Sequence, residues 1–421
     1  MRSAGRLGEA AFPARRRPKK AAKLRANAKL FFQTLGYCQG GKRESFERRS
    51  AALPIYRAIG LMSGTSMDGV DAALIETDGE TSIAFGPTAA FPYSDSDRAL
   101  LRGALAEAAI LDDRDARPGV LAVAERMVTE RHAEAVEALI REHAIDPASV
   151  DIVGFHGQTV LHRPKQRLTI QIGDGRALAS RLGVDVVYDF RAADIAAGGE
   201  GAPIVPVFHR ALVVAGGLRG EVALLNIGGV ANVSYISDGA EPIACDTGPG
   251  NALIDDLMLQ RTGAPIDRHG HTAARGRVNE AALLRLLAHP FFEESPPKSL
   301  DRNTFSLDII RNLSTEDAAA TLTAFTAASV LRLFPHLPKE PQLLIVCGGG
   351  ARNPILVREL VMRLPCKVTT AEVVGWSSDF LEAQAFGFLA ARVLEGKPLT
   401  FPTTTGVSEP TPGGVLARAN G

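Results

Sequence analysis

Cysteine is scarce in this 421-residue chain, and the patterns that usually accompany cysteine are absent. Cys38, Cys245, Cys347 and Cys366 show neither paired metal-ligand spacing nor the density of a disulfide framework. No apolar run approaches the roughly 18 residues that span a bilayer, and no hydrophobic signal-peptide core stands at the N-terminus. The composition therefore excludes a disulfide scaffold and favours a cytoplasmic protein without a membrane partner.

The two common nucleotide-binding fingerprints are also missing. The sequence has no Gly-x-x-x-x-Gly-Lys-Ser/Thr, and no predicted strand leads into a Gly-x-Gly-x-x-Gly turn. If a nucleotide binds, it must be held by turns between strands, because a phosphate loop at a helix N-terminus is not available.

The net charge is zero, but positive charge is concentrated at the start of the chain. Residues 1–57 carry 15 Lys or Arg against 3 Asp or Glu, whereas the remainder carries 32 against 44. Few aliphatic residues and the run ARRRPKK at 14–20 predict a disordered basic leader over 1–57. The leader could touch nucleic acid or act as a transit peptide, but a dispensable extension is the simplest interpretation. Because the remainder is acidic, we expect no nucleic-acid partner.

Two glycine-rich hairpins of the same design recur about one domain apart. The first turns through residues 63–69 and the second through residues 226–231, each between two short predicted strands. Glycines and small polar residues at such a tip let an anion approach free backbone N–H groups. Two facing tips would grip a polyphosphate from both sides, whereas each hairpin alone could be an ordinary tight turn. In the first tip, Asp68 could hold Mg²⁺ directly or through water.

The order of the predicted elements repeats as well. Helical periodicity over about 96–143 follows the first hairpin, and three short buried strands then end in polar residues, where α/β sheets place their ligands. The pattern restarts near residue 221 and closes with a helix over about 379–395. This order predicts two related α/β domains, 58–220 and 221–421, with a cleft between them.

Asp246 is the best candidate for chemistry. It ends a predicted strand just before the glycine-lined start of a helix near Asn251, where the helix dipole favours an ionised carboxylate. Such a carboxylate can accept a proton from water or a sugar hydroxyl, a step worth roughly 10²–10⁴ in rate. The alternative is an N-cap aspartate, which contributes about 1 kcal/mol to stability.

Other polar residues are of the kind that recognises sugar hydroxyl and amide groups. They are His156, Gln158, Asp174, Asp189, Asp194 and Glu382. His156 could instead satisfy a buried backbone carbonyl, and Glu382 could complete a capping box with Asp379. The run 267–271, DRHGH, contains metal-ligand types, but without a further partner at suitable spacing we expect a solvated loop.

Taken in order, the motifs of this chain closely resemble those of the anhydro-N-acetylmuramic acid kinases. The matching strings are GLMSGTSMDGVD (60–71), HGQT (156–159), DFR (189–191), GGEGAP (198–203), NIGG (226–229), DTGPGN (246–251) and CGGG (347–350). The resemblance runs from about residue 58 to the final helix, and the basic leader has no counterpart. One departure is that Ala192 and Ala193 follow Arg191, where many relatives have arginines. Lys298 could replace an arginine contact, or it could be a solvated surface lysine.

The resemblance implies the duplicated fold shared by sugar kinases, actin-like ATPases and heat-shock chaperones. It also implies a reaction of cell-wall sugar recycling, in which ATP phosphorylates O6 of 1,6-anhydro-N-acetylmuramic acid while water opens the anhydro bridge, giving N-acetylmuramic acid 6-phosphate. ATP and Mg²⁺ are the implied cofactors, and a homodimer is the implied assembly. An ordinary hexosamine kinase of the same fold, or a non-catalytic nucleotide- or sugar-binding regulator, are the alternatives.

Carried over residue by residue, the resemblance assigns roles at matching positions. Asp246 matches the catalytic aspartate and Glu382 a carboxylate near the sugar; His156, Gln158 and Asp189 are the other expected sugar contacts. The expected nucleotide site comprises Gly64, Thr65, Ser66, Met67, Asp68, Gly69, Val70, Asp71, Asn226, Gly228, Gly229, Gly348, Gly349 and Gly350. The three glycines at 348–350 would leave room for adenosine, although a plain strand-to-helix turn is the alternative.

Overall fold

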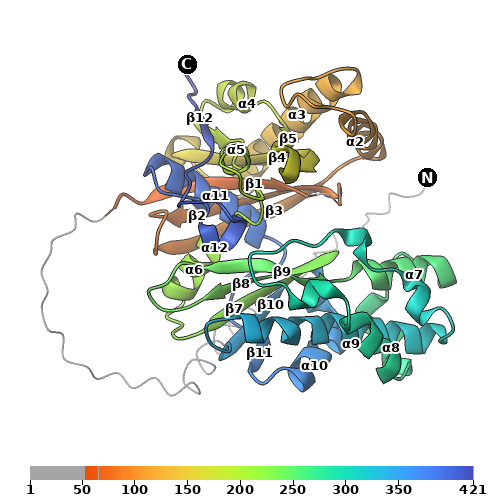
Figure 1. Cartoon of the computed structure of the whole chain (residues 1–421). Coiled ribbons are helices and arrows are strands. Elements are labelled where there is room, and N and C mark those ends of the chain that lie inside the picture. The colour runs from red at the N-terminus through yellow and green to blue at the C-terminus, as the bar shows by residue number, and fades with distance from the viewer. Residues whose placement is uncertain (1–52, 65, 421) are drawn as a thin grey trace, which may run out of the picture.

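Two α/β lobes stack on each other in the computed structural model, which describes residues 53–64 and 66–420 (Figure 1). Most of the expected basic leader lies outside the described residues. Its last two residues, Tyr56 and Arg57, do not belong to a leader, because the first strand begins at Tyr56.

The first sheet has the strand order β12-β6-β4-β1-β2-β3, with β5 paired to β4. Its strands are β1 (Tyr56–Ser63), β2 (Gly69–Thr77), β3 (Ile83–Pro92), β4 (Ile152–Arg163), β5 (Leu168–Ile172), β6 (Val186–Tyr188) and β12 (Val415–Ala417). The second sheet has the order β11-β10-β7-β8-β9. Its strands are β7 (Val222–Ile227), β8 (Val230–Ile236), β9 (Ile243–Pro249), β10 (Leu343–Cys347) and β11 (Lys367–Thr370).

The two sheets follow one plan. In the first, β1 pairs antiparallel with β2 and parallel with β4, while β2 pairs antiparallel with β3 and β4 parallel with β6. In the second, β7, β8, β9, β10 and β11 repeat those relationships in the same order. The predicted pair of glycine hairpins is therefore real, and the predicted duplicated α/β fold is confirmed.

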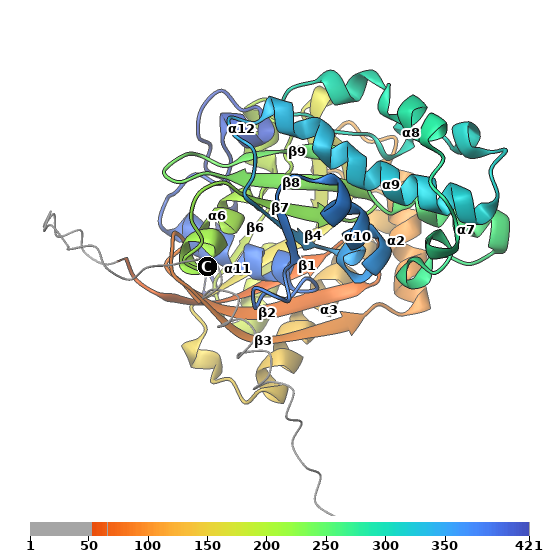
Figure 2. The same ribbon diagram turned by 90° about the horizontal axis from the view of Figure 1, so that it is seen from below.

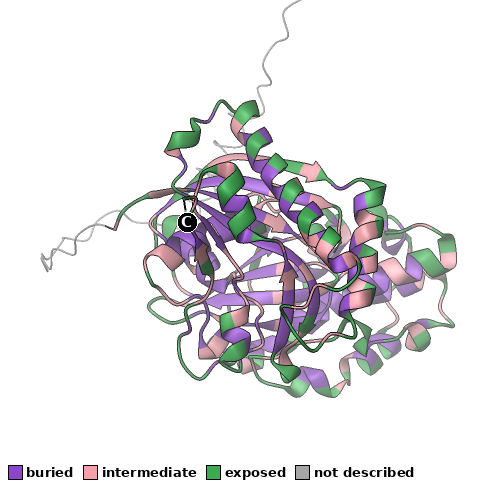
Figure 3. Ribbon diagram, turned by 90° about the horizontal axis from the view of Figure 1, so that it is seen from above, coloured by how far each residue is buried: buried purple, intermediate pink, exposed green. Residues whose placement is uncertain are grey.

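Helices form layers outside and between the sheets (Figures 1 and 2). Outside the first sheet lie α2 (Asp95–Ala108), α3 (Val120–Glu142) and α4 (Gly175–Leu182); outside the second lie α9 (Thr315–Leu333) and α10 (Pro354–Arg363), with α7 (Ala252–Thr262) and α8 (Glu280–Leu287) beside α9. Between the sheets, α6 (Pro206–Ala215) and α11 (Leu381–Leu394) share one apolar core with strands of both lobes. Figure 3 shows the buried sheets inside and exposed faces on the outer helices.

The helical stretch expected over 96–143 is two helices rather than one. A capping box between Ser94 and Asp97 starts α2, which ends at Ala108. The chain then turns through Pro118 and Gly119 before α3 begins. Gly119 has a φ of 51°, a backbone conformation that favours glycine and cannot continue a right-handed helix.

The last part of the chain returns to the first sheet. α11 packs on β1, β2 and β4, and β12 pairs with β6. The sequence placed α11 and β12 in the second domain, but both lie with the first sheet, whereas α12 (Pro402–Thr405) contacts β9 of the second sheet. The helix is buried almost all round, so it needs apolar partners on both sides and obtains them by lying between the lobes.

One helix passes a membrane-span test by length and composition. The segment Thr315–His336, which contains α9, is apolar enough to cross a bilayer, but 83% of its apolar window is buried inside the molecule. It packs against α7, α8, α10 and β9, so it is a core helix of the second lobe.

Candidate active site

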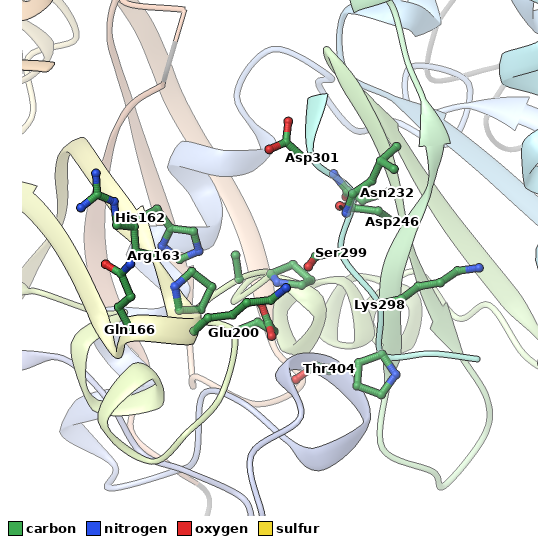
Figure 4. Close-up of a pocket in the computed structure, with 16 residues that line it drawn as sticks. His162, Arg163, Gln166, Glu200, Asn232, Asp246, Lys298, Ser299, Asp301 and Thr404 are labelled. Carbon is green, nitrogen blue, oxygen red and sulfur yellow. Dashed lines mark hydrogen bonds between the residues drawn. The ribbon is translucent and has the colours of Figure 1, made fainter. Parts of the chain in front are cut away.

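A cavity of about 660 Å³ lies between the two lobes (Figure 4). The first lobe contributes His162, Arg163, Pro164, Lys165, Gln166, Glu200, Ala202 and Pro203; the second contributes Asn232, Asp246, Pro297, Lys298, Ser299, Leu300 and Asp301; Thr404 comes from α12 (Pro402–Thr405). This volume is within the range of small-molecule sites, and the mixture of charged and amide groups suits a polar ligand.

Asp246 lies in this cavity wall, on β9 opposite Asn232 of β8. Its Oδ2 accepts a hydrogen bond from the Leu300 N–H at 2.8 Å, and its own N–H donates to the Lys298 carbonyl at 3.0 Å. Burial raises the pKa of the carboxyl to about 6, opposed by the Leu300 N–H, so burial outweighs the dipole effect expected from the sequence. The N-cap alternative is wrong, because the N-cap of α7 is Asn251.

The tip of the first hairpin is braced by Gln158. The Gln158 Nε2 donates to the Gly64 carbonyl at 3.0 Å, and its Oε1 accepts from the Ser63 hydroxyl. Within the tip, the Met67 N–H donates to Gly64 and the Ser66 hydroxyl donates to Asp68 Oδ1 at 2.9 Å. Thr65, expected at the nucleotide phosphates, lies outside the described residues.

Carboxylates gather beside this tip. Burial, together with the charges of Asp68, Asp379 and Glu382, raises the pKa of Asp71 to about 7. Burial also raises the pKa of Glu382, which Arg191 opposes. Mutual repulsion among carboxylates is relieved when a cation binds, so this donor set fits Mg²⁺ carried by nucleotide phosphates. In the described part of the chain, no three His, Cys, Asp or Glu side chains are close enough to hold a metal ion by themselves.

The second hairpin joins the glycine loop at 348–350. The Asn251 N–H donates to the Gly228 carbonyl at 2.8 Å, and the Gly250 N–H donates to Gly229 at 2.9 Å. Gly348 has a φ of 74°, a backbone conformation that favours glycine, and a Cβ there would lie 2.2 Å from Asn226 Oδ1. The structure thus brings together the second hairpin, the start of α7 and the glycine loop, as one backbone-rich surface.

The predicted sugar contacts lie in different surroundings. The His156 Nδ1 is 2.9 Å from the Gly157 carbonyl, and its Nε2 accepts from Arg191 Nε at 3.1 Å. Asp189 Oδ2 accepts from Arg114 at 2.7 Å. Neither residue, nor Gln158, is among the cavity-lining residues, so their contact with sugar stays a prediction.

Several structural alternatives can now be decided. The capping-box reading of Glu382 is wrong, because Phe380 is the N-cap of α11 and makes no side-chain cap, while Asp379 pairs with Arg352. Asp174 is the N-cap of α4. Asp267 accepts hydrogen bonds from two backbone N–H groups of its own loop, at Thr272 and Ala273.

The comparisons with known proteins show the family of this chain. The family model described as anhydro-N-acetylmuramic acid kinase matches residues 56–419. The chain belongs to this family. Curated relatives named anhydro-N-acetylmuramic acid kinase include one from Rhodopseudomonas palustris (strain ATCC BAA-98 / CGA009), 58% identical over 86% of this chain and 99% of its own length. One from Azorhizobium caulinodans is 60% identical over 86% of this chain and 98% of its own.

The solved structures that resemble this chain are more distant. Component A of the Acidaminococcus fermentans (R)-2-hydroxyglutaryl-CoA dehydratase is 10% identical, with a TM-score of 0.43 over 80% of this chain and 98% of that chain. A ROK family glucokinase from Streptomyces griseus, in complex with glucose and AMPPNP, is 13% identical with a TM-score of 0.38, over 80% of this chain and 100% of that chain.

Several lining residues of this anhydro-N-acetylmuramic acid kinase family member were not foreseen. His162, Arg163, Lys165 and Gln166 come from the β4–β5 hairpin, and Asp301 follows Leu300. The hairpin could have been suspected, because it begins within a few residues of the HGQT motif. Glu200 lies within the GGEGAP string that carried the resemblance, but nothing in that string indicated that its side chain lines the cavity.

Lys298 lines the cavity without offering its charge to it. The Nζ donates to the Phe291 carbonyl at 2.8 Å, and burial lowers the pKa of this half-buried amine. Lys298 is therefore not a solvated surface lysine, and its replacement of an arginine contact stays a prediction.

Proposed function

We propose that the protein transfers the γ-phosphoryl group of ATP to O6 of 1,6-anhydro-N-acetylmuramic acid while water opens the anhydro bridge. The product is N-acetylmuramic acid 6-phosphate. The observation that carries this proposal is the place of Asp246, in the wall of the interlobe cavity with one carboxylate oxygen held by a backbone N–H. A pKa of about 6 leaves the group ionised at neutral pH while keeping it a useful base.

The proposed chemistry at the sugar balances without a further reactant. Asp246 accepts a proton from water, and the water oxygen forms the new bond to C1. The C1–O6 bond breaks, and O6 attacks the γ-phosphorus as ADP leaves. The proton on Asp246 passes to solvent, so the sum is sugar, water and ATP giving sugar phosphate, ADP and a proton.

Positioning of the nucleotide is assigned to the two hairpins and the glycine loop. Phosphoryl transfer asks a protein chiefly for positioning and charge neutralisation. Backbone N–H groups of the first hairpin tip, other than that of Met67, and those at 228–229 would face the phosphates. The 348–350 loop would lie against adenosine. Mg²⁺, held by the phosphates and by Asp68 directly or through water, would neutralise charge there.

Product analysis in H₂¹⁸O tests the proposal. With ATP, Mg²⁺ and the anhydro sugar, we expect a 6-phosphate that carries one ¹⁸O at C1 and none in the phosphate. A hexosamine kinase would phosphorylate a free amino sugar without taking up solvent oxygen. A non-catalytic regulator would bind ATP and release no ADP. Either outcome would contradict the proposal.

Asp246→Asn supplies the matched variant. It keeps the side-chain volume and an oxygen for the Leu300 N–H, but it removes the base. We expect ATP affinity to be retained and turnover to fall roughly 10²–10⁴-fold. Near-normal turnover would overturn the assignment of the base.

We further propose that the protein is a cytoplasmic homodimer. Light scattering coupled to size-exclusion chromatography tests the assembly, and cell fractionation tests the location.

A further inference from the structure

A short segment outside both sheets hydrogen-bonds to both the backbone and the carboxylate of Asp246. The segment 296–301 follows η5 (Pro290–Glu293) and passes beside β9. Its Lys298 carbonyl accepts from the Asp246 N–H at 3.0 Å, and its Leu300 N–H donates to Asp246 Oδ2 at 2.8 Å. We call residues 298–300 the strap. The direction of the carboxylate therefore depends on a segment about fifty residues further along the chain.

The strap is anchored by the Lys298 side chain. Figure 4 shows Lys298 pointing away from the middle of the cavity. Its Nζ donates to the Phe291 carbonyl at 2.8 Å and lies 4.4 Å from the centre of the Phe291 ring, a cation–π distance. Phe291 is buried and packs edge-on against Phe292. The lysine thus ties the strap to an aromatic core.

The strap occupies one carboxylate oxygen of Asp246 and leaves the other able to accept a hydrogen bond from a ligand. Among the described residues, the Leu300 N–H is the group that hydrogen-bonds to this carboxylate. The second oxygen is therefore available to a water molecule in the cavity. If the strap moved, the carboxylate could turn about its side-chain torsions, and the free oxygen would no longer be aimed.

We propose that Lys298 is a positioning residue: by holding the strap through Phe291, it keeps Asp246 aimed at the attacking water. This inference rests on the proposed role of Asp246 as base. A misplacement of about 1 Å at a reacting group can cost 10²-fold in rate, so a side chain that touches no substrate can still control turnover.

Other charged groups face the same space. His162, Arg163, Lys165 and Glu200 lie across the cavity, and Asp301 follows the strap. Lys298→Met leaves all of these in place, while it removes the ammonium and keeps an apolar stem of similar length. Because Lys298→Met also removes a positive charge from the cavity wall, Lys298→Arg, which keeps that charge, is measured beside it.

Steady-state kinetics of Lys298→Met test the proposal. We expect kcat to fall roughly 10- to 100-fold, with KM for ATP unchanged. The acid limb of the kcat profile should move to higher pH, because a loosened Leu300 N–H no longer stabilises the carboxylate anion. Lys298→Arg, which retains charge, donors and a cation–π partner, should restore most of kcat. Lys339→Met, which removes an exposed lysine paired with Glu221, serves as the control and should leave the kinetics unchanged.

Each contrary result has a distinct meaning. A raised KM for the sugar with unchanged kcat and an unmoved acid limb would mean that Lys298 contacts substrate, and would overturn the proposal. Unchanged kinetics would overturn it as well. If Lys298→Met does not fold, Lys298→Gln, which keeps an N–H donor for the Phe291 carbonyl, should show a smaller loss of kcat and the same pH shift. If Lys298→Gln shows no loss of kcat and no pH shift, the proposal is overturned. Asp246→Asn, measured in parallel, separates failure of the base assignment from failure of the anchor.

Discussion

Arg191 donates a hydrogen bond from Nε to Nε2 of His156 at 3.1 Å. The Nδ1 of His156 lies 2.9 Å from the Gly157 carbonyl, which can only accept, so the proton of the neutral ring is on Nδ1. Burial and the charge of Arg191 hold the pKa of His156 well below its usual value, which keeps Nε2 free to accept. Arg191 also donates from Nη1 to the Gly201 carbonyl at 2.8 Å. His156 therefore fixes an arginine that supports the cavity-lining loop at 200–203.

His156→Phe should weaken sugar binding without affecting the nucleotide. The ring contact with Phe386 can persist, but Arg191 loses its acceptor and the loop loses part of its support. We expect KM for the sugar to rise about 10-fold, the effect of removing a hydrogen bond to a charged group worth roughly 1.5 kcal/mol, with KM for ATP unchanged. His156→Gln, whose amide oxygen can accept from Arg191, should restore most of the affinity. A rise in KM for ATP instead would place His156 on the nucleotide side.

The pH dependence of turnover should report Asp246. Only the ionised carboxylate can take a proton from water, so activity should be lost as pH falls through the raised pKa of about 6. Below that value, kcat should decrease about tenfold per pH unit, and the residual activity of Asp246→Asn should lack this limb. Single-turnover rates at saturating ATP and sugar measure it without interference from binding. An acid limb near pH 4 would mean that the carboxylate is not buried when it reacts.

The sequence predicted the duplicated plan and drew attention to Asp246, which lines the cavity, because both leave local marks. A strand that breaks into glycines and resumes is visible in the chain, and Asp246 directly follows an apolar strand. The course of α11 left no such mark. This helix is buried because strands of both sheets pack against it, and its almost uniformly apolar sequence does not indicate which sheet it contacts.

The hydrogen bonds that hold the site residues in place also could not be predicted from the sequence. The bonds of Asp246 to the strap and of Gln158 to Gly64 connect residues more than fifty positions apart. A sequence pattern gives the type of such residues but not their partners. Gln158 and His156 therefore read as sugar contacts, whereas the structure engages both with other protein groups.

Gly60 and Gly154 should be intolerant of any side chain. A Cβ at Gly60 would lie 1.8 Å from the Ala383 carbonyl oxygen, and one at Gly154 would lie 2.0 Å from that of Phe386, because α11 rests directly on β1 and β4. Because the backbone must move to make room, either alanine substitution should lower the free energy of unfolding by about 1–3 kcal/mol or more, the typical cost of overpacking a core. Gly103→Ala, in α2 with 3.4 Å to its nearest neighbour, should be neutral or stabilising by about 0.5–1 kcal/mol. Equal effects in denaturant titrations would contradict this account of the α11 contact.

His132 should make the first lobe sensitive to acid. It is fully buried in α3, its Nδ1 lies 2.7 Å from the Val128 carbonyl, and burial lowers its pKa from 6.5 to about 4. The unfolded chain binds the proton more readily, so His132 costs no stability above pH 6.5 and destabilises the fold progressively as pH falls from 6.5 to 4. The full loss is about 3 kcal/mol, at 1.36 kcal/mol per pKa unit. His132→Leu should remove that part of the pH dependence in urea titrations at pH 7 and pH 5, while the buried His209, whose pKa is also lowered to about 4, should continue to contribute its own. An equal pH dependence in the variant and the parent would mean that His132 can take up a proton without leaving the native fold.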